Sequence, residues 1–410
     1  MSATLPNSRY QGKNILVVAP FMHLKGHFSV FCADMAEGFK MNGANVTILS
    51  PYPAQATFAP PSDIRIVCLE NMADNFSALM KLAWRVYTGN PIMLCLAWLV
   101  IHVRPGAYDL VYWSDFEPDN QQSTWPLGLA RLVGLYRHRT AFTEHHDFSW
   151  NKHRWQRLLR LDRLRLKHIE MFVHSRRLLE GIRLIMGWPD AGHYVAHGLW
   201  PDPASNEDRY TARFALGIPS DARVLLVFGM QAIRRKGIDI LADAIRGMSL
   251  NRSLIVLFAG VRVRDEPHPF DHPDLTDKLN LHILHNESFI PKEMVKSIFA
   301  AADAVWAYYG NFVGASGVLA QTIAYGRIPI SSRNSESGDL CKTYRLGITT
   351  PTDDIGGVRA ALEKFLTMPA ITQTDLELAT QGAANTMSWP CVTHYIMDIV
   401  FATNDFARPP

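Results

Sequence analysis

Cysteine is scarce in this sequence, and the few that occur are placed in a way that excludes two classes of protein. There are five, an odd number, scattered along the chain and never spaced as CxxC. This argues against a disulfide scaffold and against a structural zinc site, and it fits a reducing compartment. The five are Cys32, Cys68, Cys95, Cys341 and Cys391.

Long apolar runs, a leader and a charge excess are missing as well. The most apolar segment, 91–103, is shorter than the ~20 residues of a membrane-spanning helix. Residues 1–14 are polar and contain a proline, so we expect no signal peptide. Lys and Arg number 41 against 38 Asp and Glu, and a formal charge of +3 does not mark the chain as a nucleic-acid binder. We expect a soluble, cytoplasmic protein with no nucleic-acid partner.

Length and composition indicate a globular protein of more than one domain. At ~100–200 residues per domain, 410 residues correspond to two or three domains. Short apolar runs alternate with helical patterns, which is typical of a parallel sheet covered by helices on both faces. The predicted strands are 14–19, 46–49, 110–113, 141–143, 171–173, 194–196, 224–228, 254–259, 282–285, 304–307 and 328–331.

A break in this alternation predicts a domain boundary. Segment 198–208 is rich in Pro, Ser and Asn and has no periodicity, which indicates a linker. A strand–helix series of similar size lies on each side of it. We therefore predict an α/β chain with two Rossmann-like, doubly wound domains that face a central cleft.

A basic loop follows the first predicted strand of the second half. Gly229 ends this strand, and Arg234, Arg235, Lys236 and Gly237 then open a helix. Cations at a strand-to-helix turn are placed to neutralise phosphate oxygens. Taken alone, such a segment is more often a solvated loop, so both interpretations stay open at this point.

A glycine-rich loop lies further along the same half. Residues 311–317 lead into a predicted helix at 318–325, with Ser316 as its N-cap. Gly314 and Gly317 allow backbone N–H groups to approach an anion. The alternative is a helix start whose glycines serve only the turn. Both loops follow strands of one domain, at the edge where doubly wound folds bind ligands.

In order and spacing, these motifs resemble the donor domain of GT-B glycosyltransferases of the retaining family 4 type. That family has a strand ending in a glycine loop, then Lys-Gly before a Leu/Ala-rich helix. An Ala-Asp pair and a Gly-rich turn before a helix ending Ala-x-Gly follow later. The corresponding segments here are 227–229, 236–244, 254–260, 289–294, 302–305 and 314–330. Looser matches occur at 26–27, 143–147, 173–175, 196–199 and 387–389.

The resemblance implies a GT-B fold in three parts. Residues 1–200 would bind the acceptor, residues 201–388 a nucleotide-sugar donor, and residues 389–410 would form a helix that packs back on the first domain. The implied activity is retaining transfer of a sugar from a nucleoside diphosphate to a saccharide or lipid-linked saccharide, in polysaccharide biosynthesis. UDP is chosen because it is the commonest donor nucleotide of such families. No cofactor and no metal are expected, and the sequence has no Asp-x-Asp triplet.

The donor site that the resemblance implies combines both loops. The residues for the diphosphate are Arg234, Arg235, Lys236, Ser316, Gly317 and Val318, and those for the nucleoside and sugar are Phe289, Asn311, Gly314 and Gln321. Two positions depart from the family pattern. Met230 stands where an arginine is usual, and Val313 and Gln321 stand where the family has two glutamates. An amide can still hydrogen-bond ribose hydroxyls, whereas a valine cannot. Arg234 or Arg235 would replace the missing guanidinium, and Asn311 would supply a polar contact to the sugar.

Lys236 and one of two histidines are the implied catalytic residues. His145 or His146 would lie near the anomeric carbon, unless this segment is a polar strand end without a ligand. Gly26 and His27 are assigned to the acceptor, and His27 has the alternative of a plain helix-start residue.

Other functions and a membrane contact stay open. A nucleotide-sugar 2-epimerase shares this scaffold, and a degenerate member could bind nucleotide sugar without turnover, for which Met230 and Val313 argue. Segment 152–167 is basic and interleaved with Leu and Trp, which suits a peripheral contact with the inner face of the plasma membrane. Its arginines spread around the helix, so a solvated or partly buried helix is the other interpretation.

Overall fold

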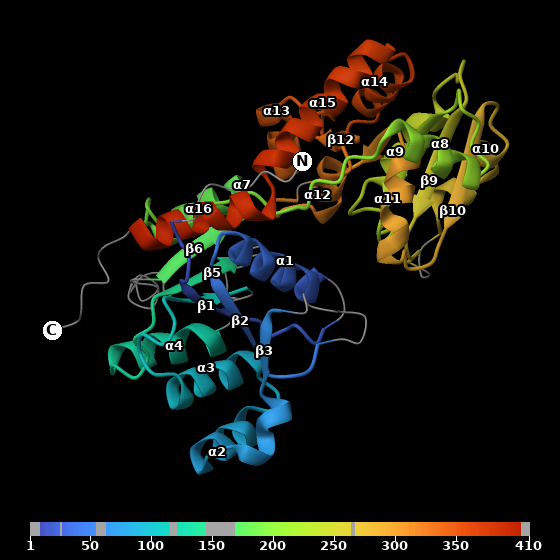
Figure 1. The fold of residues 1–410 in the computed structure, drawn as a ribbon. Helices are drawn as coiled ribbons and strands as arrows, with labels where there is room; N and C mark the ends of the chain where they lie inside the picture. Colours follow the sequence, from blue (N-terminus) through green and yellow to red (C-terminus); the bar gives the residue numbers. More distant parts are fainter. Residues whose placement is uncertain are drawn as a thin grey trace. The chain divides into compact units, whose positions relative to one another are not determined.

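The chain divides into two compact units. The computed structural model describes residues 9–24, 27–54, 63–114, 121–144, 169–263, 267–310 and 312–402. Unit 1 comprises Met1–Gly198 and Trp389–Pro410, and unit 2 comprises Leu199–Ser388. Figure 1 shows the two units with their labelled elements.

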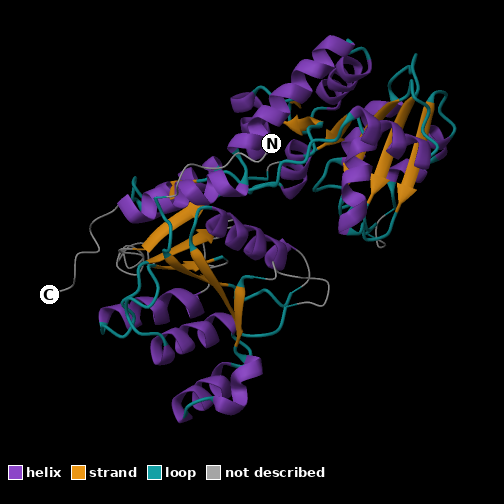
Figure 2. Ribbon diagram, in the orientation of Figure 1, coloured by secondary structure: helices purple, strands orange, loops and turns teal. Residues whose placement is uncertain are grey.

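Unit 1 is built on a seven-stranded parallel sheet of order β3-β2-β1-β4-β5-β6-β7. Its central strands are buried on both faces, as expected for apolar strands covered by helices (Figure 2). The strands are β1 (Asn14–Val18), β2 (Asn45–Ser50), β3 (Arg65–Cys68), β4 (Leu110–Trp113), β5 (Thr140–Glu144), β6 (Ile169–Val173) and β7 (His193–Tyr194).

Helices cover both faces of this sheet. Leu16 and Val18 belong to the same buried cluster as α3, whereas Phe39 of α1 meets Tyr112 of β4 edge-on, at 5.4 Å between ring centres. None of the helices that the structure describes is long and apolar enough to cross a membrane. The helices are α1 (His27–Met41), η1 (Glu70–Asn75), α2 (Ala78–Tyr87), α3 (Pro91–His102), α4 (Gln121–Leu132), α7 (Arg176–Met186) and α16 (Trp389–Ala402).

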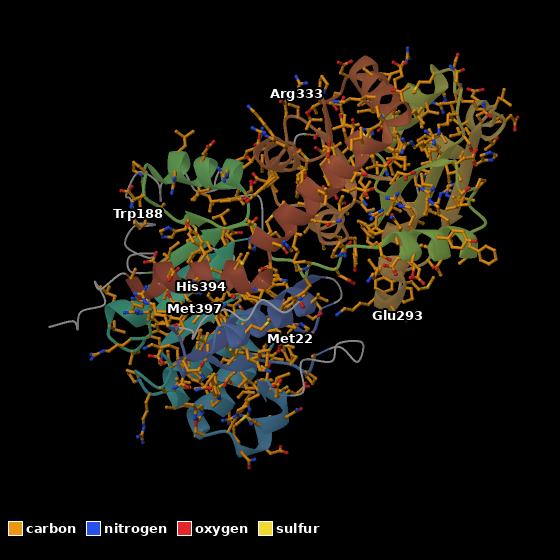
Figure 3. The ribbon with its side chains drawn as sticks, turned by 45° about the horizontal axis from the view of Figure 1, so that its top comes forward. Met22, Trp188, Glu293, Arg333, His394 and Met397 are labelled. Carbon is orange, nitrogen blue, oxygen red and sulfur yellow. The ribbon has the colours of Figure 1, made fainter. Side chains whose placement is uncertain are left out.

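The last helix packs on the first helix of the chain. The Asn42 amide donates to the carbonyl of Pro390 at 2.8 Å and to Thr393 Oγ1 at 3.0 Å. The Asn42 carbonyl oxygen pairs with His394 Nδ1 at 3.1 Å. Figure 3 labels His394 and Met397 on α16, and Met397 is buried. The C-terminal helix is therefore an integral part of unit 1.

Unit 2 has a six-stranded parallel sheet of order β10-β9-β8-β11-β12-β13. Its strands are β8 (Arg223–Phe228), β9 (Leu254–Ala259), β10 (Leu281–Asn286), β11 (Ala304–Trp306), β12 (Ile328–Ser332) and β13 (Ile348–Thr350). Its helices are α8 (Asn206–Ala215), α9 (Ile238–Arg246), η3 (Pro269–Asp271), α10 (Pro273–Thr276), α11 (Lys292–Ala301), α12 (Gly317–Ala324), α13 (Glu336–Tyr344), α14 (Ile355–Leu366) and α15 (Ala370–Thr386).

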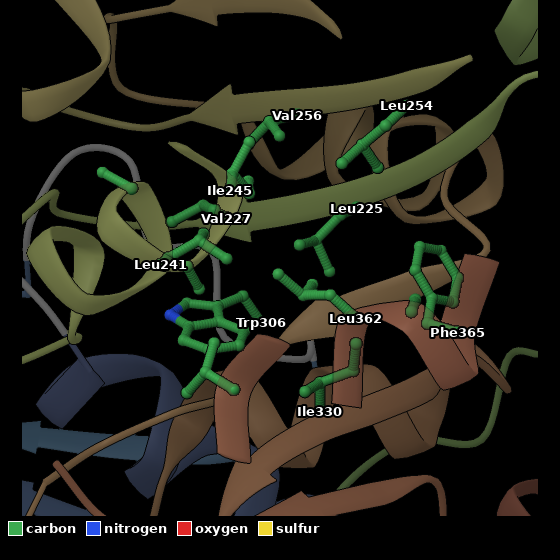
Figure 4. Packing of buried hydrophobic residues seen from close by; sticks show 14 of the residues in the cluster. Leu225, Val227, Leu241, Ile245, Leu254, Val256, Trp306, Ile330, Leu362 and Phe365 are labelled. Atoms are coloured by element: carbon green, nitrogen blue, oxygen red, sulfur yellow. The ribbon is translucent and has the colours of Figure 1, made fainter. Parts of the chain in front are cut away.

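Alternate residues of β8 face two different cores. Leu225 and Val227 pack with α9, α14 and Trp306, a cluster drawn in Figure 4. Val224 and Leu226 pack with α8 and α11 on the other face. Period-two alternation in a strand accounts for this division.

A buried charged network joins α8 to the beginnings of β8 and β11. The Arg213 guanidinium contacts the Asp303 carboxylate at 2.7 Å, and the Val224 backbone N–H donates to the same carboxylate at 2.9 Å. The Gln373 amide donates to the other oxygen of Asp303 at 3.4 Å. Asp303 is therefore the common acceptor of three elements.

The predicted strands are confirmed with small shifts at their ends, whereas the predicted linker is too long at its C-terminal end. Segment 198–208 is not a linker throughout, because α8 begins within it at Asn206. Ser205 Oγ accepts from the Asp208 N–H at 3.0 Å, and the Asp208 carboxylate accepts from the Ser205 N–H at 2.8 Å. This capping box starts a helix in a segment whose composition alone favours a loop.

Candidate functional site

The candidate site lies where the strand order of unit 2 reverses. β8 pairs with β9 on one side and with β11 on the other. The chain runs from β8 through α9 to β9, and from β11 through α12 to β12, so the two connections diverge from neighbouring strands. Ligands of open α/β sheets bind at the carboxyl ends of strands at such a point.

Two glycines let the ends of β8 and β9 come together. Gly229 has φ +81° and Gly260 has φ +140°, backbone conformations that L side chains rarely adopt. A Cβ on Gly260 would lie 2.3 Å from the carbonyl oxygen of Gly229. The close approach of the two backbones therefore requires glycine at position 260.

We expect Gly260→Ala to lower the free energy of unfolding by about 3 kcal/mol, because the new methyl group meets backbone that cannot move aside. Gly217→Ala is the matched control, since Gly217 also has positive φ (+65°) but open space around its Cβ position. About 1 kcal/mol is expected there. Urea denaturation measures both, and equal losses would contradict the steric account.

Lys236 is the buried cation of this site. Its side-chain ammonium donates to the carbonyl of Phe228, the last residue of β8, and lies 3.3 Å from the Cβ position of Gly229. Burial, and secondarily the charge of Arg235, lowers the pKa of Lys236 to about 8. This ammonium lies at the carboxyl end of β8, the edge of the sheet where ligands of open α/β folds bind.

Aromatic residues after β11 hold the backbone around this lysine. Trp306 Nε1 donates to the Lys236 carbonyl at 2.7 Å, and the rings of Trp306 and Tyr308 stack at 5.0 Å. Gly237, with φ +57°, packs on Tyr308, whose Cδ1 would be 2.6 Å from a Cβ. The basic loop and the loop after β11 are therefore in direct contact.

The two arginines of the basic loop differ from Lys236 in exposure. Arg234 and Arg235 are exposed, whereas Lys236 is buried. The Arg235 guanidinium lies over the Phe312 ring at 5.0 Å, a cation–π contact with the glycine-rich loop. The structure thus brings Arg235 into contact with that loop, and it gives Arg234 a position open to solvent.

The start of α12 provides oriented backbone donors. Ser316 is the N-cap, as predicted, and its Oγ accepts from the Leu319 N–H at 3.1 Å. Burial raises the pKa of Tyr309, and its hydrogen bond to Ser316 offsets part of that rise. The amides of Gly317 and Val318 belong to the first turn of α12. Backbone N–H groups in the first turn of a helix have no carbonyl acceptor within that helix. This is an arrangement that suits an anion.

The remaining predicted donor residues are spread around this centre. Gly314 is buried, and its Cβ position lies 2.7 Å from the Phe312 ring. Gln321 lies in α12 and is half-buried. Phe289 is 80% exposed before α11, so its ring has no packed position.

Several predicted residues cannot be placed. Asn311, His145, His146 and Gly26 lie outside the described residues, as does segment 152–167. His27 is the first residue of α1. The catalytic histidine and the acceptor residues therefore stay predictions.

Sequence reasoning missed two polar residues next to Gly260. Gln231 is fully buried, and its Nε2 donates to the Gly260 carbonyl at 2.8 Å. Within the described part of the chain its Oε1 has no hydrogen-bond partner. Arg262 pairs with Gln231 in an isolated bridge and contacts Glu287 at 3.0 Å and also Asp271. The only available signal was their position just after β8 and β9.

Sulfur and metal chemistry add little to the picture of this site. No disulfide joins the cysteines that the structure describes, and Cys341 is the one buried in unit 2. Across the described ranges, no three His, Cys, Asp or Glu side chains gather as metal ligands would.

Comparisons with solved structures define the fold. No family model matches the sequence, and a search of curated proteins gives no match. A glycosyltransferase from Rickettsia africae is similar in structure, with a TM-score of 0.68 and 13% identity over 96% of this chain and all of that one. The sucrose-phosphate synthase of Thermosynechococcus elongatus gives a TM-score of 0.63 and 16% identity over 96% of this chain and 100% of that one. Anabaena HepE in complex with UDP-glucose gives 0.64 and 16%, over 95% of this chain and 99% of that one. The chain has the GT-B fold, which confirms the predicted fold class.

Proposed function

We propose that this protein is a glycosyltransferase that moves a sugar from a nucleoside diphosphate, with UDP as the nucleotide, to a saccharide or lipid-linked saccharide acceptor. The observation that carries the proposal is the buried Lys236 behind Gly229, in the same unit as the capped first turn of α12 and in a chain of GT-B fold. HepE, a structure of similar fold, was solved in complex with UDP-glucose and with UDP. The nucleotide and the acceptor class rest on the family resemblance.

The chemistry asks for a group that stabilises the departing diphosphate. As the bond between the anomeric carbon and the phosphate oxygen breaks, negative charge grows on the diphosphate. Lys236 and the amides of Gly317 and Val318 would hold that charge, with Arg235 above the loop. Preorganised donors of this kind do the work that a metal ion does elsewhere, so we propose a metal-independent reaction.

We further propose that the configuration of the sugar is retained. In that reaction the acceptor hydroxyl attacks the anomeric carbon from the face that the diphosphate leaves, and the departing phosphate oxygen takes the hydroxyl proton. No protein nucleophile is required by this route. His145 or His146 would contact the sugar, and Gly26 and His27 the acceptor. Five scattered cysteines without a CxxC pair fit a reducing compartment, and we propose that the reaction takes place in the cytoplasm.

Donor binding should depend on pH through Lys236. Its pKa of about 8 means that the lysine loses its charge as the pH rises through 8. A diphosphate that needs the charged form should therefore bind about tenfold more weakly at pH 9 than at pH 7. Isothermal titration with UDP-glucose measures this, and the Lys236→Ala variant should show a flat profile. A flat profile for the wild type would contradict the role of this lysine.

The activity is tested by product analysis with candidate donors. The protein is incubated with UDP-, GDP-, ADP- and dTDP-sugars, and free nucleoside diphosphate and the sugar product are measured. Release of nucleoside diphosphate, by transfer or slow hydrolysis, supports the proposal. An epimerised donor would instead identify the protein as a nucleotide-sugar 2-epimerase. Binding without product would identify a degenerate member of the family, and the exposed Met230 and the valine at position 313 would explain its lack of activity.

A further inference from the structure

Helix α2 of unit 1 has two apolar faces, and only one of them is buried. Met80 is buried, and Trp84 packs against Tyr52 and Phe76 at 5.8 and 5.6 Å between ring centres. Ser77 caps the helix, with its Oγ accepting from the Met80 N–H at 3.3 Å. This inner face fixes α2 to α3 and to the sheet beyond.

The outer face of α2 is an apolar stripe in solvent. Leu79, Leu82 and Val86 recur at steps of three and four, so they lie on one side of the helix. Their exposed fractions are 66%, 59% and 63%. Scattered exposed leucines are common, but three in register on a helix whose other face is already packed call for a partner.

Charge next to the stripe has one sign. Lys81 and Arg85 are exposed and lie one turn apart along one side of the stripe. Between Asp74 and Asp109 the sequence has no acidic residue. The nearest acids in sequence, Glu70 and Asp74, belong to the preceding η1.

Helix α4, which also packs on α3, has the same combination of exposed apolar residues and cations. Its end and the following turn expose four apolar residues and carry two cations, and residues 121–143 contain no acid. In Figure 1, α2, α3 and α4 group together in unit 1. The exposed apolar residues are Leu129, Leu132, Val133 and Leu135, and the cations are Arg131 and Arg137.

We propose that the α2 stripe docks unit 1 onto an anionic lipid surface. An exposed apolar strip with cations beside it is typical of a helix that lies in the interface of a bilayer. A helix of ten residues is far too short to span it, so α2 would lie along the surface. Three side chains also fall short of the ~800 Å² that each partner contributes to a stable protein interface. The inference does not depend on the proposed donor chemistry.

Vesicle binding tests this docking surface. The full chain is mixed with vesicles of phosphatidylcholine, alone or with a quarter phosphatidylglycerol, and the bound fraction is measured by flotation. We expect binding to the anionic vesicles, weakened at least tenfold in Leu82→Glu/Val86→Glu. Lys81→Glu/Arg85→Glu should also weaken binding at least tenfold, because each cation near an anionic surface increases the partition coefficient about fivefold.

Controls separate docking from folding and from self-association. Leu279→Glu alters a leucine of unit 2 that is more exposed than those of the stripe (81%), and this variant should bind as the wild type does. Leu82→Ser removes apolar area without adding charge, and each variant is checked by its thermal unfolding and its reaction with donor. Two results would overturn the proposal: variants that keep full vesicle binding, or a wild-type dimer in sedimentation velocity that the α2 variants dissociate. Loss of donor turnover with vesicle binding intact would count against the proposed function alone.

Discussion

Lys236→Ala is expected to weaken the binding of a nucleoside diphosphate sugar by at least ~30-fold, or about 2 kcal/mol. The substitution removes the one buried ammonium that donates at the end of β8 and would face the diphosphate. Charge-assisted hydrogen bonds in desolvated sites are worth this much or more. Isothermal titration with the donor that gives the largest thermal shift measures the loss, and the nucleotide-dependent shift itself should disappear.

Lys364→Ala is the matched control for this prediction. It removes the same charge from an exposed position on α14 of the same unit. Its donor affinity should stay within about twofold of the wild type. An undiminished nucleotide-dependent shift in Lys236→Ala would place the phosphate elsewhere.

Asp303→Ala should produce the largest loss of stability in unit 2, about 3–5 kcal/mol. It leaves the Arg213 guanidinium buried without its carboxylate partner, and the Val224 N–H without its acceptor. Breaking a buried pair from one side has this cost because a buried charge remains uncompensated. Urea unfolding followed by fluorescence measures it.

Two further variants serve as controls for the loss of stability in Asp303→Ala. Asp303→Asn keeps a hydrogen-bond acceptor and should lose less than Asp303→Ala. Asp274→Ala removes an exposed carboxylate near Arg246, and a change below about 0.5 kcal/mol is expected. A stability for Asp303→Ala within 1 kcal/mol of wild type would show that backbone carbonyls alone satisfy the Arg213 guanidinium.

The fold could be predicted from sequence to the extent that its strands are long and apolar. The runs at β8 and β9 are buried at nearly every position, and the pattern finds them without structure. The edge strands β3 (Arg65–Cys68) and β13 (Ile348–Thr350) were missed because they are short and each has residues that are not buried. The start of α8 was missed although its Ser-x-x-Asp capping signal stands in the sequence.

The site was predictable in position more than in detail. Arg234, Arg235 and Lys236 are adjacent basic residues that the sequence does not distinguish by burial. Only tertiary packing by Trp306 and Tyr308 decides that Lys236 is the buried one. The same holds for Gln231, which is buried where the backbones of Gly229 and Gly260 come close together. Long-range contacts of this kind leave no periodic trace in the chain.

The most direct test is a crystal structure of the protein soaked with UDP-glucose. Our account predicts that the diphosphate oxygens contact the Lys236 ammonium and the backbone amides of Gly317 and Val318. A nucleotide bound with its phosphates away from Lys236 and the first turn of α12 would contradict it.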